Sequence, residues 1–93
     1  MVTARADPQG GGWVCEVDVD HNGERSHHTV TVTAGDLERW GQGGGREKED
    51  AEDLVARSFE FLLEREPPGS ILRRFDVSAI RRYFPEYDSQ FKR

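Results

Sequence analysis

The stretch DAEDLVARSFEFLLERE, from Asp50 to Glu66, decides the fold. At the helical repeat of about 100° per residue, its apolar side chains fall on one broad arc centred near Leu62. Acidic residues crowd its amino end, where they complement the helix dipole, and Pro67 and Pro68 end the helix because proline has no amide hydrogen. The arc is about twice as wide as the stripe of an ordinary surface helix. We therefore expect a central helix with a sheet on one side and helices on the other.

A strand-turn-strand pattern precedes this helix, between Trp13 and Thr33. Asn22-Gly23 is typical of a tight type I′ turn, because both residue types accept the positive φ that this turn requires. Pairing His21 with Glu24 then puts polar and oppositely charged partners on one face. The other face is mostly apolar and consists of Trp13, Cys15, Val17, Val19, Ser26, His28, Val30 and Val32. Turn chemistry and both faces agree on one register for an antiparallel hairpin.

The segments around these two elements give shorter patterns. Residues 1–12 contain Pro8 and three consecutive glycines, and they predict a flexible amino-terminal tail. Asp36–Trp40 predicts a short helix ended by Gly41, and residues 41–48 predict a glycine-rich hinge.

Beyond the two prolines, Ser70 is expected to cap a short helix with Ile71, Leu72 and Phe75 on its apolar side. A second short helix is predicted up to Pro85, with Ala79, Ile80, Tyr83 and Phe84 facing inward. The order of residues 86–93 is left open. Residues 13–93 are thus expected to form a single α+β domain, in which a two-stranded antiparallel hairpin packs on a central helix with short carboxyl-terminal helices.

Composition and charge limit the classes of function. The 93 residues are 34% apolar and 33% charged, which suits one core of modest size.

No apolar run approaches the roughly twenty residues that cross a bilayer, so we expect no membrane partner. The single cysteine, Cys15, has no partner for an internal disulfide, which indicates a cytoplasmic protein. The net charge is −5: residues 1–72 carry seven Lys/Arg against fifteen Asp/Glu, and residues 73–93 carry six against three. The acidic body makes nucleic acid an unlikely partner.

The blocks SFEFLLERE, ILRRFD and RYFPEY, between Ser58 and Tyr87, resemble those of a group of small uncharacterised bacterial proteins of about this length. The resemblance covers about a third of the chain. It implies that the carboxyl-terminal half is a defined structural unit, and it assigns no activity, cofactor or catalytic residue.

Four chemical motifs are incomplete. Residues 18–23 match the start of a calcium-binding EF-hand loop, but Thr29 stands where the bidentate glutamate belongs. Cys15, His21, His27 and His28 are of zinc-ligand types, but the register directs His27 to the face opposite Cys15 and leaves His21 at the turn. No serine lies in a nucleophile elbow, and the glycine-rich segment lacks the lysine of a phosphate-binding loop. We therefore predict no enzyme, no cofactor, no metal and no small-molecule substrate.

The remaining expectation is a small non-enzymatic interaction or regulatory module. Its partner would be another protein or a second copy of the chain, because a lone hairpin leaves two open edges and a homodimer would cover them. The alternative is a ribbon-helix-helix regulator that reads DNA with a two-stranded ribbon. The candidate interaction surface combines the hairpin edge with Arg73, Arg74, Arg81, Arg82, Tyr83 and Tyr87.

Overall fold

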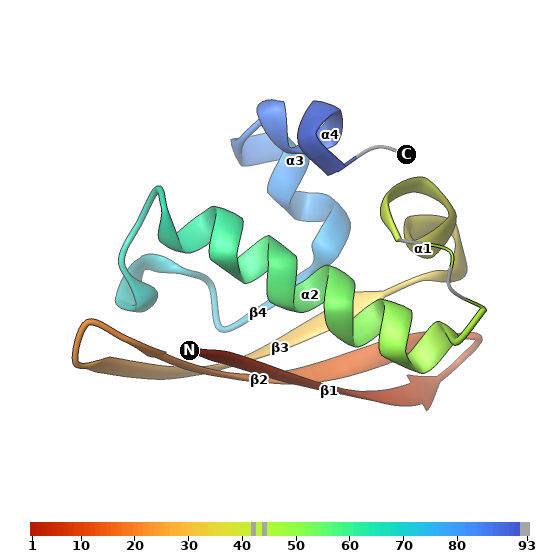
Figure 1. The fold of residues 1–93 in the computed structure, drawn as a ribbon, viewed down its shortest axis with the longest axis horizontal. Coiled ribbons are helices and arrows are strands. Elements are labelled where there is room, and N and C mark those ends of the chain that lie inside the picture. The colour runs from red at the N-terminus through yellow and green to blue at the C-terminus, as the bar shows by residue number, and fades with distance from the viewer. Residues whose placement is uncertain (42, 44, 92–93) are drawn as a thin grey trace.

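The computed structural model describes residues 1–41, 43 and 45–91. Four strands form one sheet in the order β1-β2-β3-β4, and the helices lie over one of its faces (Figure 1). The strands are β1 (Val2–Gln9), β2 (Gly12–His21), β3 (Glu24–Val32) and β4 (Arg74–Asp76). The first three pair antiparallel, and β4 pairs parallel to β3. The fold is therefore α+β, but its mixed four-stranded sheet replaces the predicted two-stranded hairpin.

The helices are α1 (Ala34–Trp40), α2 (Glu47–Leu63), α3 (Ile80–Tyr83) and α4 (Glu86–Phe91), with short 3-10 turns η1 (Pro68–Ser70) and η2 (Val77–Ala79). In Figure 1, α2 lies between the sheet and the layer that contains α3 and α4. This placement agrees with the width of its apolar arc. Its buried side chains are Ala51, Leu54, Val55, Ser58, Phe59, Phe61 and Leu62.

The register predicted for residues 13–32 is confirmed. Trp13 is opposite Val32, Cys15 is opposite Val30, and the pairing runs unchanged to His21 and Glu24. Asn22 and Gly23 have φ values of 52° and 82°, as the two-residue turn requires. Cys15, Val17, Val19, Val30 and Val32 are buried on the face of the sheet that the helices cover.

The predicted amino-terminal tail is wrong, because residues 2–9 form β1 along the free side of β2. Gly10 and Gly11 have φ values of 56° and 83°, so they make a second tight turn of the kind that Asn22 and Gly23 make. Val2, Ala4 and Ala6 face the helices and alternate with exposed Thr3 and Arg5. The alternation and the Gly-Gly pair are the sequence signals that distinguish this strand from a flexible tail.

The helix predicted after Ser70 is also wrong. Ser70 ends η1, and Arg74–Asp76 form β4, which pairs with Thr29–Thr31. Extended geometry is favoured here because the second edge of β3 would otherwise leave backbone groups unpaired. Phe75 consequently faces α2, where its ring centroid lies 6.0 Å from that of Phe59.

The segment that connects β3 of the sheet to α2 begins with α1. Thr33 caps this helix: its hydroxyl accepts a hydrogen bond from the Asp36 amide, and the Asp36 carboxylate accepts one from the Thr33 amide. Leu37 and Trp40 face inward as predicted. The predicted hinge at 41–48 includes residues 42 and 44, which lie outside the described residues, and α2 already begins at Glu47. None of the helices in the described part of the chain is long and apolar enough to cross a membrane.

Candidate functional site

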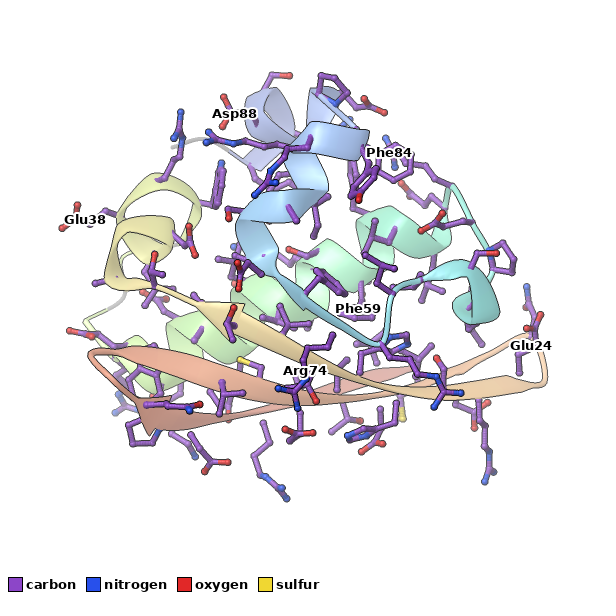
Figure 2. All side chains as sticks on the ribbon, turned by 180° about the vertical axis from the view of Figure 1, so that it is seen from behind. Glu24, Glu38, Phe59, Arg74, Phe84 and Asp88 are labelled. Atoms are coloured by element: carbon purple, nitrogen blue, oxygen red, sulfur yellow. The ribbon has the colours of Figure 1, made fainter. Side chains whose placement is uncertain are left out.

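The predicted interaction surface does not form one surface. Arg74 lies on the sheet, far from Phe84 and Asp88 at the opposite end of the molecule (Figure 2). The guanidinium of Arg81 lies 5.7 Å from the ring centroid of Trp40, on the α1 side. Arg73, Arg82 and Tyr83 are exposed, and Tyr83 carries the largest exposed aromatic surface among the described residues. The six residues are therefore divided among different parts of the molecule.

Tyr87 is a core residue, and its assignment to the interaction surface is wrong. Its side chain is fully buried, and its hydroxyl lies 2.7 Å from that of Ser58. Ser58 donates to the carbonyl of Leu54, so Tyr87 is the donor in the pair. Burial raises the pKa of Tyr87 to about 12. The Tyr87 ring also packs edge-on against Phe61 of α2, with 5.3 Å between the ring centroids, and so α4 is held against α2.

An apolar pocket of about 380 Å³ lies between the end of α2, the segment before β4 and α3. Leu62 comes from α2, and Phe84 follows α3, where Figure 2 places it beside the end of α2. The volume falls within the range of about 300 to 1,000 Å³ that is usual for binding pockets. The lining residues are Leu62, Glu66, Ser70, Ile71, Leu72, Phe75, Ala79, Ile80, Tyr83 and Phe84.

Two exposed apolar side chains mark the rim of this pocket. Leu72 is 55% exposed and Tyr83 is 68% exposed, and apart from Met1 they are the exposed large hydrophobic residues of the described chain. Both also line the pocket. The sequence interpretation placed Leu72 on the inner side of a helix, whereas the extended backbone turns Ile71 inward and leaves Leu72 outside. The sequence interpretation included Tyr83 in the interaction surface but also predicted that it faces inward from a helix, which its exposure contradicts. It missed Leu72 and the pocket.

The charged side chain in the lining of the pocket is acidic. Glu66 is the one charged residue among the lining residues that the structure describes. Glu24 adds a second carboxylate near η1, because a side-chain carbon placed on Gly69 would lie 4.0 Å from its Oε2. A cation beside an apolar group is therefore the complementary ligand chemistry.

The open face of the sheet carries a polar cluster around His27. Its Nδ1 lies 2.8 Å from Asp18 Oδ1, and its Nε2 lies 2.7 Å from Glu16 Oε1. Both nitrogens donate to carboxylates only when the ring is protonated, so the bonds to Asp18 and then Glu16 raise the pKa of His27. The same bond from His27 lowers the pKa of Glu16. This exposed cluster links β2 to β3.

His28 lies on the buried face of the sheet, and its surroundings favour the neutral ring rather than the protonated one. Its Nδ1 donates to the carbonyl of Leu72 at 2.7 Å, and its Nε2 accepts from the Ser26 hydroxyl at 2.7 Å. Burial lowers the pKa of His28, which favours the neutral ring. His28 therefore joins β3 to the segment before β4 as a satisfied core residue.

The sheet separates the residues of zinc-ligand type. Cys15 and His28 are on the helix side, whereas His27 is on the open side. Burial raises the pKa of the Cys15 thiol to about 12, which keeps it protonated and unreactive. Within the described residues, no group of three or more His, Cys, Asp and Glu side chains is arranged to hold a metal ion.

The sheet order bears on the two assembly hypotheses. The homodimer expectation depends on two open hairpin edges, but β1 pairs along β2, and β4 pairs with β3 over Thr29–Thr31. A ribbon-helix-helix protein needs its strand free to pair with that of a second chain. Here β3 has neighbours on both sides, so neither hypothesis retains the open strand on which it depended.

No protein-family model matches the chain, and it has no significant match to a curated protein or to a solved structure. The geometry of the described residues is therefore the basis for the function proposed below.

Proposed function

We propose that the protein is a non-enzymatic interaction module that binds a segment of a partner protein in the apolar pocket beside Leu72 and Tyr83. The observation that carries the proposal is the coincidence of the pocket with these two exposed side chains. Apolar surface that remains exposed around a concavity is typical of a binding site. An apolar side chain of the partner would fill the pocket, and Leu72 and Tyr83 would become buried around it.

Charge defines the chemistry of the partner segment. Glu66 supplies a carboxylate inside an otherwise uncharged lining, and Glu24 lies near η1. We therefore assign the pocket to an amphipathic segment that carries Lys or Arg beside its apolar anchors. A second copy of this chain is disfavoured, because each copy carries a net charge of −5 and two such copies repel.

A photo-crosslinking residue in place of Tyr83 tests the proposal in the native host. It should trap a partner segment with apolar residues and a neighbouring Lys or Arg, identified by mass spectrometry of the crosslinked peptide. The same crosslinker in place of Glu38, which is exposed on α1 at the side of the molecule opposite Phe84 (Figure 2), should not trap that segment. Crosslinks that join only copies of this chain would overturn the proposal.

Two charge reversals provide a matched pair of variants. Glu66→Lys should abolish the Tyr83 crosslink, because it places a cation in the pocket. Glu64→Lys makes the same change on an exposed side chain outside the lining, and it should leave the crosslink intact. Equal crosslinking in all three proteins would exclude the pocket as the site.

A further inference from the structure

The outer edge of β1 is open over only part of its length. Met1 and Asp20 exchange backbone hydrogen bonds: the Met1 ammonium donates to the Asp20 carbonyl, and the Asp20 amide donates to the Met1 carbonyl at 2.8 Å. Antiparallel pairs alternate between bonded and non-bonded, so the even-numbered residues of β1 direct their backbone groups away from β2. These residues are Val2, Ala4, Ala6 and Pro8.

Two of these four positions have no donor to offer. The amide of Ala6 donates to Oε2 of Glu52 at 2.9 Å, so a side chain of α2 closes the edge there. Pro8 has no amide hydrogen. Among the described residues, no group accepts from the amides of Val2 and Ala4. A strand can therefore be added at the amino-terminal half of β1, while Glu52 and Pro8 protect the other half.

The opposite edge strand, β4, presents fewer backbone groups for strand addition than β1. β4 has three residues, and η2 begins directly after it at Val77. A strand of that length presents too few outward backbone groups to hold an added chain. β1, with eight residues, is the longer of the two edge strands, and it can accept an extended segment.

Acidic side chains of α2 lie beside this edge and determine which charges the added segment should carry. Ala56 and Glu60 follow Glu52 by one and two turns on nearly the same side of α2, and Glu49 lies one turn before it. Glu49 and Glu60 are exposed, and within the described residues neither belongs to an ion pair. Lys or Arg side chains that point to this side would lay their stems over Ala56 and bring their charges to the two carboxylates.

We propose that β1 accepts, by strand addition at Val2 and Ala4, an extended segment with Lys or Arg at alternate positions. The backbone bonds would supply affinity, and the acidic side of α2 would select the charge pattern. The site is separate from the apolar pocket, so either proposal can fail without the other.

Amide NMR with a blocked hexapeptide of alternating Lys and Thr tests this site. Saturable shifts and at least tenfold slower hydrogen exchange are expected at the amides of Val2 and Ala4. The matched peptide of alternating Glu and Thr should cause neither. The proposal fails if both peptides act alike or if these amides do not respond. Protection that rises with protein concentration in the absence of peptide would replace the proposed partner with a second copy of the chain.

Three variants identify the edge itself. Ala4→Pro removes one outward donor without touching the β1–β2 bonds, as Pro8 already does, and it should abolish binding. Glu52→Ala frees the Ala6 amide but also releases Lys48, whose Nζ lies 3.7 Å from Glu52 Oε2, so the change is made in a Lys48→Ala background. There it should tighten binding about fivefold through one more backbone bond. Glu49→Ala removes the same charge without opening the edge and should weaken binding. If Ala4→Pro does not fold, the affinities of the other two variants still test the site, because Glu52→Ala should raise the affinity for the peptide and Glu49→Ala should lower it. Weaker binding in both would overturn the assignment.

Discussion

The hydroxyl groups of Ser58 and Tyr87 lie 2.7 Å apart in the core, and they join α2 to α4 across 29 residues of sequence. Tyr87→Phe removes one hydrogen bond but leaves Ser58 bonded to the Leu54 carbonyl, so we expect a loss of about 1 kcal/mol in unfolding free energy. Tyr87→Ala also leaves a cavity and should cost about 3 to 5 kcal/mol. Urea unfolding measures both. Equal losses for the two variants would contradict a buried ring.

His27 and His28 should titrate in opposite directions from the ordinary histidine pKa of about 6.5. Carboxylate bonds raise the pKa of His27, and burial lowers that of His28. His27 therefore stabilises the fold fully below pH of about 6.5, and its contribution is lost as the pH rises through its folded pKa. The contribution of His28 is present above pH of about 6.5 and is lost as the pH falls through its folded pKa.

Imidazole NMR titration checks the order of the two values, and His27→Gln and His28→Gln assign the signals. The stability of His27→Gln relative to the native protein should improve as the pH rises. A His28 signal that titrates above that of His27 would contradict the structure.

Gly11→Ala should destabilise the protein by about 1 kcal/mol, because its φ of 83° is unfavourable for a residue with a side chain. No atom lies within 4 Å of the added carbon, so the loss would come from the backbone conformation alone. Gly35→Ala is the control: its added carbon makes an ordinary contact at 3.7 Å in α1, and the stability should not fall. Thermal unfolding of both variants tests whether residues 2–9 form a strand.

Leu62 and Leu72 should separate stability from binding. Leu62 is 4% exposed, and Leu62→Ala should cost about 2 to 5 kcal/mol, as truncations in a core do. Leu72 is exposed on the pocket rim, and Leu72→Ala should change stability by less than about 0.5 kcal/mol while weakening partner capture. Urea unfolding gives the first quantity, and the Tyr83 crosslink gives the second. A large loss of stability in Leu72→Ala would remove it from the binding surface.

Duplex DNA should not be shifted by the protein at about 150 mM salt. Phosphate binding needs several cations on one surface, and here Arg74 lies on the sheet while Arg81 lies over Trp40. Weak binding at low salt should disappear when Arg73, Arg74, Arg81 and Arg82 are all replaced by alanine. Sequence-selective binding that survives physiological salt would favour a DNA-binding function over the interaction module.

Local sequence patterns were sufficient to predict the β2–β3 hairpin and the buried side of α2. Asn22 and Gly23 restrict the turn to one conformation, and the turn then fixes every pair from His21 and Glu24 outward. The helical repeat likewise identified which side chains of α2 are buried, because burial follows from periodicity along a single helix.

The same kind of signal was present for β1 but weak. Val2, Ala4 and Ala6 alternate with polar residues, yet alanine has little preference for strands, and Gly10-Gly11 suits a loose linker as well as a turn. Pairing with β2 decides between the two readings, and that pairing depends on which edge of the sheet is available.

Only the tertiary structure determined β4, the burial of Tyr87, the pocket, and the partial closure of the β1 edge by Glu52. β4 is too short to specify itself, and it is extended because the backbone of β3 lies beside it. Tyr87 and Ser58, like Glu52 and the Ala6 amide, are far apart in sequence and meet only when the layers pack. Sequence periodicity reports which face of an element is apolar, whereas contacts between distant elements depend on the free energy of packing the whole chain.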